Sequence, residues 1–287
     1  MKLATTTSDF SLYTSSQKTA IELIRRAGFK YADYSFEVDY TRRSGIYSDD
    51  REGYIEDIRR TEDMGIRLVQ AHSPMGSPLK DDGQFLDDTV RCVYACSAWG
   101  IPNLVVHSGY LEGLSREETL VRNRDFFLRV LEHAERCGVN ILVENFNKMG
   151  CGGLYWIDNA PDLLAMVEAV NHPLFHAVWD VGHANMQEMP QHEALHIHDN
   201  MGGSDSHLTP FLGNVDWDSV MCGLSRIGYD GYFTFEIGSV FSPADKRRAY
   251  TENGRLKVPP IELRCAYERY IYELGKCILE KYGCFEE

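Results

Sequence analysis

Short apolar runs alternate with amphipathic helical patterns about eight times along this chain of 287 residues. The apolar runs are Leu3–Thr6, Tyr34–Val38, Ile66–His72, Asn103–His107, Asn140–Glu144, His176–Asp180, Ala194–His198 and Tyr232–Glu236. Helical periodicity fills the intervals, over Ser16–Ala27, Asp49–Met64, Phe85–Trp99, Arg116–Cys137, Ala160–Val170, Asn185–Met189, Asp216–Ile227 and Pro260–Tyr282. Strands separated by helices form right-handed units of a parallel sheet. Eight such units predict an α/β fold of the closed (β/α)8 type, a TIM barrel.

Glycines support this division, because several stand where a predicted helix gives way to the next strand. Gly28, Gly65, Gly138 and Gly228 occupy such positions, and glycine readily ends a helix. The sequence has no low-complexity segment and no linker, and barrels of this length are commonly one unit. We therefore expect residues 1–287 to form a single TIM-barrel domain.

The chain is strongly acidic, with 43 Asp and Glu residues against 29 Lys and Arg. Phosphate backbones are bound by basic residues, so the formal net charge of −14 argues against a nucleic-acid partner. No apolar run approaches the roughly 18 residues of a membrane span, and the N-terminus is too short and polar for a signal peptide. The eight cysteines include no C-x-x-C pair, so we interpret them as reduced thiols of a cytoplasmic protein.

Ionisable side chains lie at the C-terminal ends of the predicted strands. The third, fourth, fifth and eighth strands end at His72, His107, Glu144 and Glu236. Residues 176–207 hold the densest group, which includes Asp180, His183, His196, His198, Asp199, Asp205 and His207. Any one of these residues alone could be a buried residue whose hydrogen bonds are made within the core, or could mark the point where a strand meets solvent. In a (β/α)8 barrel, however, these strand ends meet at one rim, where active sites lie.

Glutamates, an aspartate and histidines together form an oxygen-rich, mixed set of candidate ligands. Such a set suits Mn²⁺, Mg²⁺ or Co²⁺ better than a structural zinc ion, which favours cysteine and histidine. Buried charges need partners or metals. The sequence therefore predicts a divalent-cation site at the rim.

Five short motifs carry a resemblance to a known family, and the likeness runs over essentially the whole chain. They are Ile141–Asn145, Trp179–Asn185, His196–Asn200, Asp205–His207 and Phe233–Glu236. In this order they resemble the xylose-isomerase-like TIM-barrel family, which includes sugar isomerases, sugar epimerases, inosose dehydratases and endonuclease IV.

The resemblance implies roles for particular residues. It makes Glu144, Asp180, His196 and Glu236 the ligands of one divalent cation, with Glu144 and Glu236 also acting as the acid–base pair. It implies substrate contacts at His72, His107, His183, Asp205 and His207. Mn²⁺ is the expected ion, with Mg²⁺, Co²⁺ and Zn²⁺ as alternatives, and a homodimer or tetramer is expected.

The reaction implied is the movement of a proton at a carbon beside a carbonyl. It needs a base, an acid and a cation that stabilises the enediolate. We therefore expect an isomerase or epimerase that acts on a small-molecule sugar or sugar phosphate. The candidate phosphate contacts are Lys246, Arg247 and Arg248, in the long segment Gly238–Pro260. This segment is either a lid over the site or a charged loop exposed to solvent.

Three alternatives stay open. Sugar epimerases tend to carry an arginine shortly after the His196 motif, where this chain has Met201, Gly202 and Gly203. The first alternative is therefore a dehydratase of keto-cyclitols. A zinc phosphodiesterase like endonuclease IV is another, because residues of its ligand types occur at His72, His107, Glu144, Asp180, His183, His196, Asp205, His207 and Glu236. The net negative charge of the chain argues against DNA as a substrate and therefore against this phosphodiesterase. The third alternative is a barrel that binds carbohydrate without converting it. It has less support, because such a protein does not need both Glu144 and Glu236.

Overall fold

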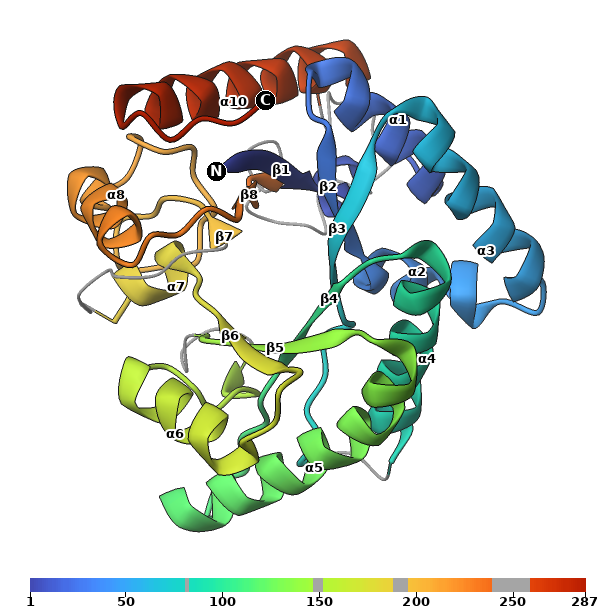
Figure 1. Ribbon diagram of the computed structural model, residues 1–287, viewed down its shortest axis with the longest axis vertical. Coiled ribbons are helices and arrows are strands. Elements are labelled where there is room, and N and C mark those ends of the chain that lie inside the picture. The colour runs from blue at the N-terminus through green and yellow to red at the C-terminus, as the bar shows by residue number, and fades with distance from the viewer. Residues whose placement is uncertain (81–82, 147–151, 188–195, 239–258) are drawn as a thin grey trace, which may run out of the picture.

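The computed structural model describes residues 1–80, 83–146, 152–187, 196–238 and 259–287. Within these ranges eight parallel strands surround a common axis, with helices outside them (Figure 1). The strands are β1 (Lys2–Thr6), β2 (Tyr31–Ser35), β3 (Arg67–His72), β4 (Asn103–His107), β5 (Asn140–Glu144), β6 (Phe175–Val178), β7 (His196–Ile197) and β8 (Tyr232–Phe235). Their hydrogen-bonded order is β6-β5-β4-β3-β2-β1-β8-β7. The predicted (β/α)8 barrel is confirmed.

Among the described residues, the ring closes between β6 and β7 through a parallel bridge that joins Asp180 to His196. The backbone N–H of His196 donates to Trp179 O at 3.4 Å. Closure therefore occurs at two of the predicted ligands and brings the C-terminal end of β6 beside β7.

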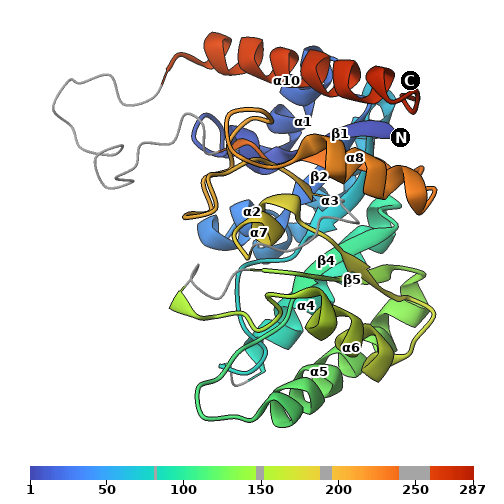
Figure 2. The ribbon, with the colours of Figure 1, turned by 90° about the vertical axis from the view of Figure 1, so that its left-hand side faces the viewer.

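Helices cover the outer face of the strands. They are α1 (Gln17–Ala27), α2 (Phe36–Arg42), α3 (Arg51–Arg59), α4 (Gln84–Trp99), α5 (Arg116–Cys137), α6 (Ala160–Val170), α7 (Val181–Asn185), α8 (Trp217–Arg226) and α10 (Ile261–Lys281). Helix α10 packs against α1 and lies across the barrel from α5 (Figure 2). The chain ends meet there, where Lys2 Nζ lies 3.0 Å from Glu286 Oε1. No helix in the described ranges has the length and apolar character to cross a membrane.

One predicted strand is wrong in position. The predicted strand Tyr34–Val38 lies three residues too late, because the apolar residues after Ser35 belong to α2, which buries Phe36 and Val38. The predicted helix Asn185–Met189 extends beyond the described residues, which stop at 187; the helix described in this region, α7, begins directly after Asp180 and ends at Asn185. The Asp180 carboxylate caps this helix by accepting from His183 N at 2.6 Å, a side-chain cap of the kind that fixes a helix start.

Candidate metal and active site

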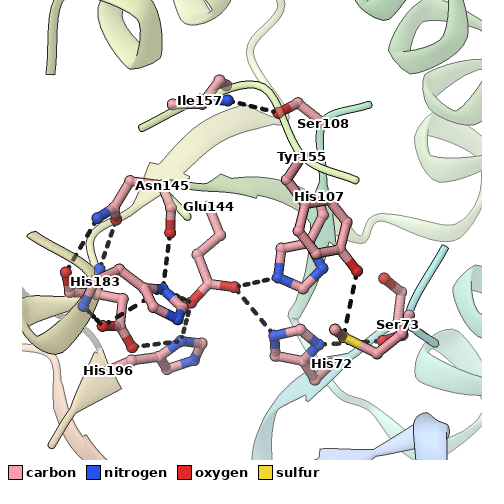
Figure 3. A network of polar contacts seen from close by, with 12 residues as sticks. His72, Ser73, His107, Ser108, Glu144, Asn145, Tyr155, Ile157, His183 and His196 are labelled. Atoms are coloured by element: carbon pink, nitrogen blue, oxygen red, sulfur yellow. Dashed lines mark hydrogen bonds and ion pairs between the residues drawn. The ribbon is translucent and has the colours of Figure 1, made fainter. Parts of the chain in front are cut away.

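Glu144 ends β5 and is the centre of a buried cluster at the C-terminal rim (Figure 3). One carboxylate oxygen, Oε2, lies 3.1 Å from His72 Nε2 and 2.8 Å from His107 Nε2. The other, Oε1, lies 2.7 Å from His196 Nδ1. The side chain is 1% exposed, so imidazoles rather than water surround this charge.

Asp180 follows β6 and is fully buried. Its Oδ1 lies 3.0 Å from His198 Nε2, whereas its Oδ2 has no hydrogen-bond partner among the described residues. The Asn145 side chain fixes the Asp180 backbone: its Oδ1 accepts from Asp180 N at 2.7 Å and its Nδ2 donates to Asp180 O at 3.1 Å. Sequence reasoning gave Asn145 no role, although its place directly after Glu144 pointed to the site.

The four predicted ligands come together. Ligand atoms of Asp180, His196 and Glu236 lie within 4.8 Å of one another, and Glu144 is in contact with His196. Three carboxylates in one largely buried place repel one another unless positive charge compensates them. Asp180 Oδ2 is buried and has no hydrogen-bond partner among the described residues, so a cation would stabilise this oxygen in particular. The donor set therefore fits a divalent cation, which prefers carboxylate oxygen and imidazole nitrogen.

A second group of candidate ligands lies beside the first. Ligand atoms of His183, His198, Asp205 and His207 also lie within 4.8 Å of one another. Asp205 is 3.4 Å from His183 and 3.3 Å from His207, and the His207 ring stacks on His198 at 3.8 Å between centroids. Three predicted substrate contacts thus meet around His198, a residue to which the sequence prediction gave no role.

Aromatic rings form a wall next to these groups. Phe146 packs on His183 at 4.2 Å and on Tyr155 at 4.5 Å, and Tyr155 packs on His107 at 4.4 Å between centroids. All four side chains are buried. The wall therefore keeps water away from one side of the polar cluster. The candidate phosphate contacts Lys246, Arg247 and Arg248 lie outside the described residues.

The cluster sets the protonation of its members. Burial raises the pKa of Glu144, but the surrounding imidazoles outweigh it and hold that pKa well below the usual range. Burial lowers the pKa of His107 to about 4 in spite of Glu144. Burial also opposes protonation of His72, yet its hydrogen bond to Glu144 and the charge of Glu144 raise the pKa of His72 to about 9. Glu144 is therefore a carboxylate at neutral pH, and its Oε2 lies between one charged imidazole, His72, and one neutral imidazole, His107.

Geometry supports the charged form of His72, since both ring nitrogens face acceptors. Nδ1 lies 3.1 Å from Ser73 O and Nε2 lies 3.1 Å from Glu144 Oε2. Only an imidazolium can donate to both. The same holds for His183, whose Nδ1 faces Asn145 O at 3.0 Å and whose Nε2 faces Asp205 at 3.4 Å.

Replacing His72 by asparagine should destabilise the cation-free protein in a pH-dependent way. The pKa of His72 rises from 6.5 to about 9 on folding, so the stabilisation is full below about pH 6.5 and disappears as pH rises through 9. The shift corresponds to a difference of about 3 kcal/mol at low pH. Chemical denaturation of both proteins in the presence of chelator, between pH 6 and about pH 10, measures it. A difference that does not change with pH would contradict the charged His72–Glu144 pair. His172→Asn, which removes the contact to the exposed Glu135 and replaces the ring nitrogen that accepts from Leu174 N, is the control, with an expected loss of about 1 kcal/mol.

Comparison with known proteins places this chain in a family. The family described as xylose isomerase-like TIM barrel matches residues 21–253, which is most of the chain. An uncharacterized protein, MJ1311, of Methanocaldococcus jannaschii is 31% identical over 149 residues, or 46% of this chain and 50% of that protein. The chain spans about half the length of the curated relatives it matches.

Solved structures share the fold over nearly the whole chain. A D-tagatose 3-epimerase-like protein aligns with a TM-score of 0.70 and 21% identity, over 98% of this chain and 99% of that one. The IOLI protein with a bound zinc atom aligns with a TM-score of 0.72 and 16% identity, over 99% and 100%. An AP endonuclease of family 2 from Brucella melitensis aligns with a TM-score of 0.64 and 18% identity, over 83% and 93%. At these identities the likeness shows the fold, and the family match carries the classification. The chain belongs to the xylose isomerase-like TIM barrel family.

Proposed function

We propose that this protein is a divalent-cation-dependent isomerase or epimerase of sugars or sugar phosphates. The observation that carries the proposal is the gathering of Glu144, Asp180, His196 and Glu236 at the C-terminal rim of the barrel. The epimerase-like structural neighbour supports the same class of reaction.

Glu144, Asp180, His196 and Glu236 are the residues that would hold the cation. The bound ion would polarise the carbonyl and hydroxyl oxygens of the substrate and stabilise the negative charge that proton removal creates. We propose one ion per chain and Mn²⁺ as the preferred ion, with Mg²⁺, Co²⁺ or Zn²⁺ as alternatives, because three carboxylates and one imidazole suit these ions. The zinc atom in the IOLI protein supports divalent binding in this fold.

Glu144 and Glu236 would exchange the substrate proton. They approach the His196 ring from its two edges, since Glu144 Oε1 lies 2.7 Å from Nδ1 and Glu236 Oε1 lies 3.7 Å from Nε2. Carboxylates placed in this way suit opposite sides of a small substrate, one as base and the other as acid. The depressed pKa of Glu144 keeps it ionised, which is the form a base requires.

Hydrogen-bond donors and acceptors around this pair would hold the sugar. His72, His107, His183, Asp205 and His207 supply both kinds of group, and the wall formed by Phe146 and Tyr155 excludes water. We propose a small carbohydrate as the substrate and the cytoplasm as the location, with the protein acting as a homodimer or tetramer. The net charge of −14 disfavours nucleic acid as a partner. Gly202 and Gly203 stand where sugar epimerases tend to have an arginine that binds a sugar hydroxyl. A keto-cyclitol dehydratase, which begins with the same proton removal, is therefore an alternative.

A second candidate function is a phosphodiesterase with several zinc ions. The specific observation in its favour is the group of His183, His198, Asp205 and His207 beside the first cluster. A further ion there, together with one between His72, His107 and Glu144, would make a multinuclear centre suited to phosphate ester hydrolysis. The AP endonuclease neighbour supports it, and the acidic charge weighs against DNA as the substrate.

Proton exchange in deuterated water tests the proposal directly. The Mn²⁺-loaded protein is incubated with ketoses, keto-cyclitols and their phosphates, and NMR follows deuterium at the carbon beside the carbonyl. We expect incorporation into at least one compound, with a new epimer, isomer or dehydrated product. Hydrolysis of bis(p-nitrophenyl) phosphate by the zinc-loaded protein, with no carbon-bound deuterium in the panel, would favour the phosphodiesterase instead.

A further inference from the structure

Asp199 is a charged residue at the rim that none of the roles above uses. It follows β7, is fully buried, and its carboxylate accepts four hydrogen bonds from N–H groups. Oδ1 accepts from the backbone N–H groups of Asn200 at 2.9 Å and Val215 at 3.1 Å. Oδ2 accepts from the backbone N–H of Phe211 at 2.9 Å and from Trp217 Nε1 at 3.1 Å. Four donors satisfy a buried carboxylate without a metal ion.

The partners of Asp199 are spread over the β7–α8 loop, residues 198–216, and the first residue of α8. This loop forms no regular helix or strand, so side-chain hydrogen bonds have a large share in setting its path. The backbone of Asp199 also pairs with that of Leu208 in an antiparallel bridge, with N–H to O distances of 2.7 Å in both directions. Asp199 therefore holds the loop at its start, in its middle and at its end.

The loop is closely packed around the Asp199 carboxylate. A Cβ atom on Gly213 would lie 2.2 Å from Asn200 O and 2.2 Å from Asp199 Oδ1, far inside van der Waals contact. The backbone of Phe211 has a φ of 74°, a left-handed conformation that is strained for phenylalanine. Such strain persists only where the surroundings hold the backbone in place, and the N–H of Phe211 donates to Asp199. The hydrogen bonds of Asp199 therefore impose a path that the local sequence does not favour.

The β7–α8 loop carries two of the predicted substrate contacts, Asp205 and His207. Asp205 Oδ2 lies 3.4 Å from His183 Nε2, and Asp205 Oδ1 lies 3.3 Å from His207 Nε2. His207 Nδ1 donates to the backbone carbonyl oxygen of Glu236 at 2.7 Å, so the loop reaches the C-terminal end of β8. The side chains of Asp205 and His207 are each 24% exposed, whereas His183 is 3% exposed. Asp205 and His207 are therefore the members of this group that an entering molecule can reach.

We propose that Asp199 is a positioning residue of the substrate site: its carboxylate fixes the path of the β7–α8 loop and so holds Asp205 and His207 where they bind hydroxyl groups of the substrate. This inference rests on the proposed function and deepens it. It assigns a role to a residue that the predicted ligands and substrate contacts leave out. The four proposed cation ligands lie outside the loop, so Asp199 should govern substrate affinity and not cation affinity.

Asp199→Asn removes the anchor with the least change of shape. All four partners donate N–H groups, so an amide in either orientation turns its own NH2 group toward two donors. We expect a KM about 10-fold higher, the effect of losing one substrate hydrogen bond. The kcat should be nearly unchanged, because Glu144 and Glu236 exchange the proton. Both constants come from deuterium exchange into the panel compound that the wild type exchanges fastest. The Kd for Mn²⁺, measured on the chelator-treated full-length protein, should equal that of the wild type.

A second background separates positioning from a general loss of structure. In a protein with Asp205→Ala and His207→Ala, the loop no longer offers these substrate contacts. Adding Asp199→Asn there should lower kcat/KM by less than about twofold, because nothing is left for Asp199 to position. A purely structural role would lower kcat/KM by the same factor in both backgrounds, since the effects of independent sites add, and would overturn the inference.

Gly213→Ala displaces the loop in another way, because its Cβ has no room beside Asp199 Oδ1 and the carboxylate stays in place. We expect the same rise in KM, and this variant in the same two backgrounds decides the question if Asp199→Asn fails to fold. Asp216→Asn is the matched control. The exposed Asp216 side chain accepts from the backbone N–H of Ser219 at 3.1 Å at the start of α8. Asparagine caps a helix as well as aspartate does, so its KM should equal that of the wild type.

The outcomes separate the two proposals. If the wild type exchanges a panel compound and folded Asp199→Asn keeps the wild-type KM, the inference is overturned and the proposed function stands. A tenfold rise in the Kd for Mn²⁺ would also overturn it, because Asp199 would then act on the cation site. If the wild type exchanges no compound, the proposed function fails and the inference fails with it.

Discussion

Replacing Glu144 by glutamine is expected to lower kcat by about 10³-fold or more while leaving the fold intact, because general acid–base groups contribute roughly 10²- to 10⁴-fold and Glu144 is also a proposed ligand. Glutamine keeps the shape of the side chain but cannot accept a proton at neutral pH. It also removes the negative charge that His72 and His196 contact. Both losses act on the reaction, so the effect should exceed that of removing a base alone.

The comparison set for this prediction has three members. Glu236→Gln should show a loss of similar size, since the two carboxylates work as a pair. Glu135→Gln replaces an exposed glutamate that contacts only His172 among the described residues, and should keep wild-type activity. Circular dichroism and melting temperature verify the fold of each variant, and deuterium exchange into the substrate measures activity. Unchanged exchange in both Glu144→Gln and Glu236→Gln would contradict the proposed mechanism.

Removal of the cation is the second change with a large expected effect. Dialysis against a chelator should reduce turnover to less than about one hundredth, because the stabilisation of developing negative charge by a metal ion amounts to several kcal/mol. The melting temperature should fall as well, since an ion at about 100 times its Kd stabilises the folded state by about 2.7 kcal/mol. Adding back Mn²⁺ should restore both.

The return of activity and the return of stability should follow one titration curve. An ion that is only structural would restore the melting temperature without a parallel return of proton exchange. Full activity in the stripped protein, verified by elemental analysis, would contradict a cation-dependent reaction. Parallel titrations with Mg²⁺, Co²⁺ and Zn²⁺ test the proposed preference for Mn²⁺.

The alternation of strands and helices made the barrel predictable from sequence. Each strand has a short apolar run, and each long helix has a clear periodicity, so their number and order follow from local patterns. The rim could be predicted too, because Glu144 ends one strand, Glu236 directly follows another, and barrel geometry brings the strand ends together.

Other features depend on information that is not local. Tyr34–Val38 reads as an apolar strand, but where β2 ends depends on how α2 packs Phe36 and Val38 into the core. Gln70 on β3 donates a hydrogen bond to Asp33 on β2 at 2.6 Å, and this contact requires a skipped residue in the register of the two strands, which no periodicity reveals. His198 lies only two residues from His196, yet its meeting with Asp205 and His207 depends on the path of the following loop. Sequence spacing alone carries no such path.

The metal content of the protein, purified without added metal and measured by elemental analysis, shows whether each chain holds one catalytic cation. We expect one exchangeable divalent ion per chain, manganese, cobalt or magnesium, held by Glu144, Asp180, His196 and Glu236. Two or three tightly held zinc ions would contradict it and favour the phosphodiesterase, for which the group of His183, His198, Asp205 and His207 offers further ligands. A protein that neither contains nor binds any divalent ion would contradict both.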